Sequence, residues 1–285
     1  DGICDNTASI GCGDPTACNY DELICVTDSN TCIYGSEAPG AACDDGDANT
    51  FNDVWNATGC ECMGTTIADE GGSGPCGGEQ IVTFDNHAYP LAEIGEQCWF
   101  AENLRSVHYA NGDAVPGDLS ESEWSETNAG AQAVYDNDNA MLETYGRLYN
   151  WHAVDDARGI CPNGWHVPTD EEWLELEMFL GMPSSEANTI GWRGTDQGGQ
   201  MKSSPEDDPS WNGSNSSGFS GLAGGARHHS NGSYFEMGDN GYHWSSTPDG
   251  ANGWHRILGA YGDNINRNFS YHEFGFAVRC VLGEQ

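Results

Sequence analysis

The stretch "RLYNWHAVDDARGICPNGWHVPTDEEW", residues 147–173, concentrates aromatic rings, two histidines and one cysteine in a short run. Two interpretations fit it. An enzyme site could hold His152 and His166 beside carboxylates, whereas a small extracellular domain could use the rings as core and the cysteine as a disulfide partner. The end of the run is clearer, because Thr169 followed by Glu172 predicts a capping box at the start of a helix.

Few regular elements are expected in residues 76–285. The helix after Thr169 should end at Gly181, and residues 145–157, "YGRLYNWHAVDDA", suggest a preceding helix. Short strands are expected at residues 79–84, 98–104 and 276–282. Residues 185–275 are rich in Gly, Ser, Asn and Trp without clear periodicity, which predicts a long loop region pinned by aromatic rings and no regular sheet.

Composition excludes several classes of partner. The 285 residues include 9 Lys+Arg against 45 Asp+Glu, a formal net charge of -36. Such a surface repels nucleic acid and anionic membranes, whose phosphates need cations. No run of roughly 18 apolar residues is present, so no membrane insertion is expected. The acidity does not predict disorder, because 10 Trp, 11 Tyr and 9 Phe can build a core.

Cysteine usage points to an exported protein. Of 12 cysteines, eight fall in the first 62 residues: Cys4, Cys12, Cys18, Cys25, Cys32, Cys43, Cys60 and Cys62. This density favours a scaffold of disulfides over zinc thiolates, since no histidine precedes His87. The sequence does not give the pairing of the eight. The predicted location is therefore outside the cytoplasm, either secreted or on a cell surface.

The chain divides by composition at "DEGGSGPCGG", residues 69–78, a linker-like stretch. We expect a cysteine-rich module at 1–34, an acidic cysteine-rich module at 35–70, a linker at 71–75 and the main domain at 76–285.

The acidic module contains "CDDGDANTFNDVWNATGCECMG", residues 43–64. Its first, third, fifth and ninth loop positions, counted as in an EF-hand, carry hard oxygen ligands: Asp45, Asp47, Asn49 and Asp53. Thr50 replaces the usual glycine and Asn56 the usual final glutamate, so the loop is not an EF-hand. A structural calcium site and an acidic turn capped by its own side chains both remain open.

Six motifs in the main domain occur in a fixed order: "GEQCWFAENLR", "YGRLYNWHAV", "CPNGWHVPTDEEW", "GFSGLAGGAR", "WSST" and "GFAVRCV". Together, residues 76–282 resemble the Fibrobacter succinogenes major paralogous domain, a bacterial exported domain related to C-type-lectin-like and formylglycine-generating-enzyme-like folds. The segment "GCGDPTACNY" resembles the "DPTACNY" cysteine-rich repeats of secreted Bacteroidetes proteins. The resemblance implies an α+β fold: a C-type-lectin-like domain with a small antiparallel sheet, two helices and long loops, after disulfide-rich small modules.

The resemblance also implies two disulfides. Cys161 would pair with Cys280, tying a helix to the last strand, and Cys76 with Cys98, pinning the entrance of the domain. In the entropic account, the longer loop restricts the unfolded chain by about 4–5 kcal/mol.

Catalysis is not expected. Formylglycine-generating relatives use copper held by paired cysteines, but Cys161 and Cys280 are the only cysteines after residue 98. No GxSxG, HExxH or nucleotide-binding glycine loop occurs. We therefore predict no catalytic residue. We also expect five further histidines to be scattered surface residues and not metal ligands: His228, His229, His243, His255 and His272.

Carbohydrate binding is the main alternative. Five aromatic residues of the loop region could stack on sugar rings: Trp211, Trp244, Trp254, Tyr242 and Tyr261. Packing in the core is the favoured alternative for these rings, and the Glu-Pro-Asn and Gln-Pro-Asp motifs of calcium-dependent lectins are absent. Five N-x-S/T sequons are candidates for glycosylation: Asn56, Asn212, Asn215, Asn231 and Asn268.

The sequence thus predicts a non-catalytic extracellular structural or adhesive protein of a bacterial surface. We expect it to be stabilised by calcium and to assemble with copies of itself into a filament or surface layer. A carbohydrate-binding adhesin is the alternative, and a formylglycine-generating-like or other enzyme is the weakest candidate.

Overall fold

The computed structural model describes residues 74–283 in full and, before them, the backbone of residues 10–11, 26–27, 50–55 and 62–66. The chain divides into two compact units, residues 1–72 and 73–285. The described residues of the first unit form two small strand pairs: β1 (Ile10–Gly11) parallel to β2 (Val26–Thr27), and β3 (Thr50–Trp55) antiparallel to β4 (Cys62–Thr66).

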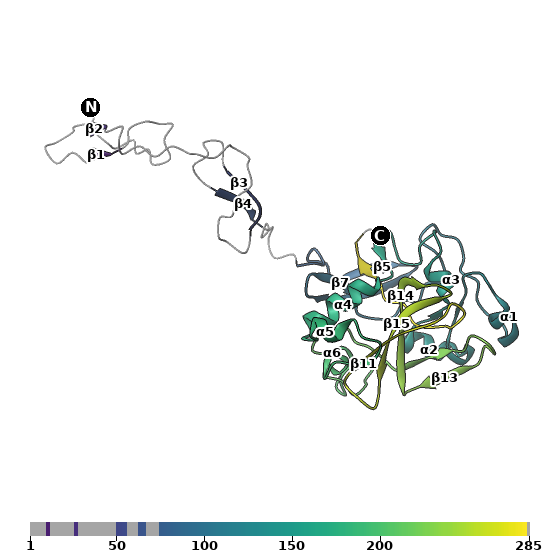
Figure 1. Cartoon of the computed structure of the whole chain (residues 1–285). Coiled ribbons are helices and arrows are strands. Elements are labelled where there is room, and N and C mark those ends of the chain that lie inside the picture. The colour runs from purple at the N-terminus through teal and green to yellow at the C-terminus, as the bar shows by residue number, and fades with distance from the viewer. Residues whose placement is uncertain (1–9, 12–25, 28–49, 56–61, 67–73, 284–285) are drawn as a thin grey trace. The chain divides into compact units, whose positions relative to one another are not determined.

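Two sheets organise the second unit (Figure 1). The first is antiparallel, in the order β10 (Trp165–His166), β17 (Val281–Leu282), β7 (Gln97–Phe100), β6 (His87–Ile94), β5 (Ile81–Phe84). The second follows the order β11 (Gly191–Arg193), β16 (Ile265–Tyr271), β15 (Asn252–Gly259), β14 (Asn240–Asp249), β12 (Gly224–Arg227), β13 (Tyr234–Met237). All its pairs are antiparallel except β12 with β14, and a small pair joins β8 (Gln132–Ala133) to β9 (Leu148–Tyr149).

Helices in the described residues are short. They are α1 (Glu121–Glu126), the 3-10 turn η1 (Tyr135–Asn137), α2 (Asn139–Tyr145), α3 (Trp151–Val154), α4 (Asp170–Phe179), α5 (Ser184–Ala187) and α6 (Gln197–Met201). In Figure 1, α4, α5 and α6 lie together on one side of the unit and α1 on the opposite side. The mixed fold with mostly antiparallel strands agrees with the predicted class. None of the helices in the described segments is long and apolar enough to reach across a membrane.

The second sheet corrects the expected loop region at 185–275. Its central strands β14, β15 and β16 are 10, 8 and 7 residues long. They escaped prediction because the buried run Gly241–Ser245 in β14 has no alternation of apolar and polar residues. The expected helix at 145–157 is also wrong over most of its length. After Tyr145, the last residue of α2, only Trp151–Val154 is helical, and Leu148–Tyr149 forms β9.

Helix α4 begins as the sequence predicts. The Thr169 hydroxyl accepts a hydrogen bond from the Glu172 amide at 3.2 Å, and the Glu172 carboxylate accepts from the Thr169 amide at 2.7 Å. This capping box satisfies amides that have no partner inside the helix. The helix buries Trp173 and Leu176, and the Trp173 ring lies 4.9 Å from that of Trp99 in β7. Helix α4 therefore packs against the first sheet.

A buried ion-pair network joins the same helix to the second sheet. The Arg256 guanidinium of β15 donates to Asp170 at 2.7 Å and to Glu177 at 2.6 Å. Glu177 also accepts from Arg193 of β11 at 2.5 Å, and Asp170 from Arg267 of β16 at 2.5 Å. All five side chains are buried. The pairing offsets the large cost of burying these charges.

Both disulfides of the second unit are the pairs that the resemblance implied. Cys76 is bonded to Cys98, and Cys161 to Cys280, with Cα–Cα distances of 4.9 and 5.9 Å. The second bond ties the loop after α3 to the segment that leads into β17.

We predict that Glu177→Ala lowers the free energy of unfolding by about 3–5 kcal/mol, because it leaves Arg193 and Arg256 with uncompensated buried charge. Urea unfolding followed by tryptophan fluorescence measures the change. Glu171→Ala, at an exposed position of the same helix, is the matched control, expected within about 0.5 kcal/mol of the parent. Equal effects of the two substitutions would contradict the role given to the network.

Candidate functional site

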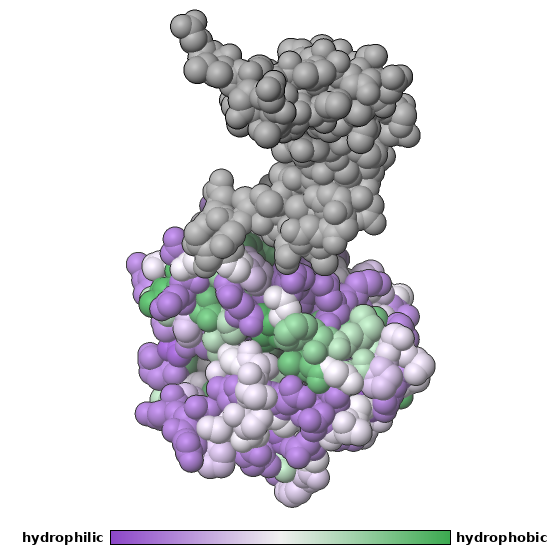
Figure 2. All heavy atoms as spheres, turned by 90° about the vertical axis from the view of Figure 1, so that its left-hand side faces the viewer, coloured by the Kyte–Doolittle hydropathy of each residue, from purple (hydrophilic) through white to green (hydrophobic). Residues whose placement is uncertain are grey.

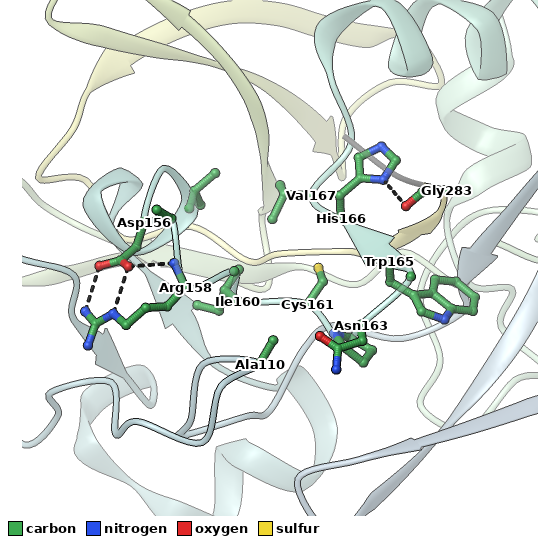
Figure 3. Close-up of a pocket in the computed structure, with 15 residues that line it drawn as sticks. Ala110, Asp156, Arg158, Ile160, Cys161, Asn163, Trp165, His166, Val167 and Gly283 are labelled. Atoms are coloured by element: carbon green, nitrogen blue, oxygen red, sulfur yellow. Dashed lines mark hydrogen bonds and ion pairs between the residues drawn. The ribbon is translucent and has the colours of Figure 1, made fainter.

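A pocket of about 380 Å³ lies beside the Cys161–Cys280 disulfide. It is lined mainly by the loop from Val154 to Val167, with Ala110 and Gly283 at its edges. Figure 3 shows Asp156 and Arg158 at one end and His166 at the other, with Cys161 between them. The pocket is built largely from the stretch that suggested an enzyme site in the sequence.

At one end, Asp156 and Arg158 neutralise each other. The Arg158 guanidinium donates to Asp156 at 2.7 and 2.8 Å, and it lies 3.9 Å above the Tyr109 ring. The hydrogen bonds from Arg158 lower the pKa of Asp156 to about 2. The carboxylate is thus ionised and occupied, which makes it a poor proton acceptor.

At the other end, His166 is held by two acceptors. Its Nε2 lies 2.8 Å from a Glu172 carboxylate oxygen, and its Nδ1 lies 3.0 Å from the Gly283 carbonyl oxygen. Burial alone would lower the pKa of His166, but these hydrogen bonds outweigh it and raise the pKa. Glu172 is the same residue that caps α4. His166 therefore links the helix start to the chain after β17.

His152 lines a neighbouring pocket of about 400 Å³. Its Nε2 lies 3.8 Å from the Glu273 carboxylate, and burial lowers the pKa of His152. No serine, threonine or cysteine is among the residues around this pocket, so His152 has no nucleophile beside it to activate.

Two of the histidines expected at the surface are in the core. His243 and His255 are 0% and 3% exposed, and burial lowers the pKa of His255 to about 3, with Arg256 adding to the effect. They are neutral packing residues. The described part of the chain contains no group of three or more His, Cys, Asp or Glu side chains placed to hold a metal ion.

The predicted calcium loop cannot be compared with the structure. Asp45, Asp47 and Asn49 lie outside the described residues. Asp53 lies in β3, where only the backbone is described. The pairing of the eight N-terminal cysteines also lies outside the described side chains.

The three tryptophans proposed to stack on sugars have different environments in the structure. Trp244 is wrong as a candidate, because it is fully buried and its Nε1 donates to the Tyr149 carbonyl. Trp254 is half-buried with the Arg267 guanidinium 3.9 Å above its ring. Trp211 is half-buried against the core, with the Lys202 ammonium 5.4 Å from its ring. None of the three lines a described pocket.

Of the two tyrosines proposed with these tryptophans, Tyr242 is buried and Tyr261 is exposed. The structure also exposes Trp192, a ring that sequence reasoning missed. Trp192 is 50% and Tyr261 91% exposed, and both line one cleft of about 420 Å³. The exposure of Tyr261 agrees with the sequence, because "GAYGDN", residues 259–264, is a turn-forming sequence that places its only aromatic residue at the surface.

The sequons differ in accessibility. Asn212 and Asn231 are exposed, Asn215 and Asn268 are half-buried, and Asn56 lies outside the described residues. The Asn215 amide nitrogen, the atom that a glycan would modify, already donates to Asp207 and Ser220. Glycosylation remains a prediction.

The geometry defines a class: a mixed, mostly antiparallel domain with two disulfides, in which the ionisable groups of the pocket beside Cys161 are paired. Residues 92–282 match the Fibrobacter succinogenes major domain, and the chain belongs to this family. The match runs from within β6 to the end of β17. Neither a curated protein nor a solved structure matches the chain.

We predict that the His166–Glu172 pair makes stability depend on pH. Since its folded-state pKa is raised, His166 stabilises the fold fully below its unfolded pKa of about 6.5, and this contribution is lost as pH rises through the folded value. Glu172 has a lowered pKa, so its contribution is present above its unfolded pKa of about 4.3 and is lost at more acid pH.

His166→Gln should therefore be most destabilising relative to the parent at about pH 5–6 and less so at pH 8–9. Urea unfolding at each pH measures the difference. Glu172→Gln, which removes the same pair from the other side, should flatten the same part of the profile. A constant difference between His166→Gln and the parent across this range would refute the assignment.

Proposed function

We propose that this chain is a non-catalytic extracellular structural or adhesive protein of a bacterial surface that associates with copies of itself. The observation that carries the proposal is an exposed apolar band on an acidic molecule. Figure 2 looks onto the side of the second unit that carries α4 and α5, and hydrophobic residues form a continuous band there. Exposed apolar side chains of this region are Met178 and Phe179 of α4 and Ile190 before β11, at 40%, 63% and 58%.

Charge favours this band as the contact between copies. Only nine lysines and arginines occur in the chain, and six of them are buried: Arg193, Lys202, Arg227, Arg256, Arg267 and Arg279. The remaining three leave a surface dominated by carboxylates, so two copies repel each other over most orientations. An uncharged apolar surface is where they can meet at least electrostatic cost.

The two disulfides support export, because such bonds persist in oxidising compartments. We further propose that residues 76–282 adopt a C-type-lectin-like arrangement and that the N-terminal cysteine-rich modules are stapled spacers. In this arrangement, Asp45, Asp47, Asn49 and Asp53 bind a structural calcium ion.

Carbohydrate binding is the second candidate function. Two exposed rings, Trp192 and Tyr261, favour it because they border one cleft whose lining side chains carry no charge.

Phe179→Glu should abolish self-association, because it places a carboxylate in the apolar band. Sedimentation velocity over a range of concentrations, with electron microscopy of the most concentrated sample, measures assembly. Tyr271→Glu, at a residue 53% exposed at the end of β16, is the control and should assemble like the parent. A parent chain that stays monomeric at every concentration would refute self-association.

Calcium removal should lower the melting temperature. EDTA is expected to reduce the Tm of the parent by several degrees, since a bound ion stabilises the folded state by mass action. The double variant Asp45→Asn, Asp47→Asn should melt at the lower temperature with or without calcium. A parent Tm that is the same in millimolar calcium and in EDTA would exclude the site.

A further inference from the structure

One cleft in the second unit combines exposed aromatic rings with amide side chains. We call it the turn cleft; it is lined by Trp192, Asn240, Gly259, Tyr261, Gly262 and Asn264. The residues come from one end of the second sheet, where β14 begins, β15 ends and β16 begins, with β11 beside β16. Its volume of about 420 Å³ lies within the range of small-molecule sites.

The two rings lie at exposed places in the fold, one in a turn and one on an edge strand. Tyr261 sits in the turn between β15 and β16, and Trp192 is the central residue of the edge strand β11. Trp192 rests on Gly259, where a Cβ atom would come within 2.9 Å of the indole Cη2. Gly259 therefore lets the indole lie against the strand and form one wall of the cleft.

Tyr261 is fixed in place although it is 91% exposed. Its hydroxyl donates to the Asp239 carboxylate at 2.9 Å, and the next-door Ala260 amide donates to the Asp239 carbonyl at 2.7 Å. On the other side, the Asn212 side chain donates to the Ala260 carbonyl at 2.6 Å. An exposed ring held this way loses little conformational entropy when a ligand packs on it.

Lys202 stabilises the turn between β15 and β16 from the buried side. Its ammonium group is buried and donates to the Gly259 carbonyl at 3.1 Å, the Gly262 carbonyl at 2.9 Å and the Asp263 carboxylate at 3.1 Å. A lysine charge is rarely buried without such partners. These three bonds fix both ends of the segment that carries Tyr261, so Lys202 is a positioning residue for the cleft.

Two amide side chains supply polar contacts. Asn240 donates to the Glu236 carboxylate at 2.6 Å, which leaves its Oδ1 beside Gly259 in the cleft. No hydrogen bond of the Asn264 amide, or of the Trp192 indole N–H, is present within the part of the chain that the structure describes. These groups are therefore available to a ligand with hydroxyl groups.

We propose that the turn cleft binds a neutral hexose unit of a glycan, by direct contacts that need no metal ion. The apolar C–H face of a pyranose packs on Trp192 and Tyr261, and its hydroxyls exchange hydrogen bonds with Asn240 and Asn264. The ligand is neutral because no lining residue is charged, while Glu236, Asp239 and Asp263 stand close behind and repel anions. This inference rests on the carbohydrate-binding candidate and names its ligand and residues.

The first test uses the full chain on an array of neutral oligosaccharides of glucose, galactose, mannose and N-acetylglucosamine. Uronic-acid and sulfated oligosaccharides are printed beside them. Binding to neutral members is expected in EDTA as well as in calcium, with no binding to the acidic ones. Binding that disappears in EDTA, or that is confined to acidic glycans, overturns the proposal.

Titration of the best-bound neutral oligosaccharide then assigns the residues. Trp192→Ala and Tyr261→Ala should each weaken binding at least about tenfold, the scale of one good contact. Trp192→Phe should keep most of the affinity but lose the fluorescence change on binding. Gly259→Ala, which displaces the indole, should weaken binding although its side chain is a single methyl group. Tyr271→Ala, at the opposite end of β16, is the control and should bind like the parent.

The outcomes separate this site from self-association. If Tyr261→Ala loses glycan binding but assembles like the parent, the cleft is a binding site independent of the apolar band. If no neutral glycan binds at millimolar concentration, or if Trp192→Ala and Tyr261→Ala bind like the parent, the inference fails. The proposal of self-association would then be tested separately, by the sedimentation experiment with Phe179→Glu.

Discussion

One guanidinium, that of Arg256, joins the parts of the second unit. It bridges Asp170 and Glu177, two carboxylates that lie two turns apart on one face of α4. Arg193 and Arg267 extend the contact to β11 and β16, and on the same helix Trp173 packs on Trp99 of the first sheet. The ion pairs thus fix the orientation of α4 on both sheets. If α4 shifted, at least one buried charge would lose its partner, which is strongly destabilising.

The burial of cations also accounts for the character of the surface. A chain with nine cations would be expected to place them outside, yet six are inside. Arg279, for example, is fully buried and has no carboxylate partner among the residues that the structure describes. It donates to Asn103 and to the carbonyls of Phe100, Phe219 and Ser220. Each cation withdrawn in this way makes the exterior more negative than composition alone suggests. Acidity is then a consequence of how the interior is built as well as a device for solubility.

The parts that could be predicted from sequence are those encoded locally. The capping box of α4 needs only Thr169 and Glu172, which are three residues apart in the sequence. Turns are likewise encoded by residues that are adjacent in the sequence. The strands β14 to β16 were missed because Trp244, Arg256 and Arg267 are buried by partners from distant segments, such as Tyr149 and Asp170. Hydrophobic periodicity in the sequence does not reveal contacts between distant segments. The turn cleft was missed for the same reason, since only the pairing of β11 with β16 brings Trp192 to Tyr261.

On a surface this acidic, an uncharged area costs the least to cover, because no carboxylate has to lose its water. The apolar band and the turn cleft are two such areas, but they are built differently. The band is apolar side chains alone, which suit another protein surface. Behind the cleft, carboxylates accept hydrogen bonds from the side chains that line it: Asp239 from Tyr261, and Glu236 from Asn240. Their charge orients the rings and amides toward a hydroxyl-bearing ligand while opposing an anionic one, so one set of residues provides both affinity and selectivity.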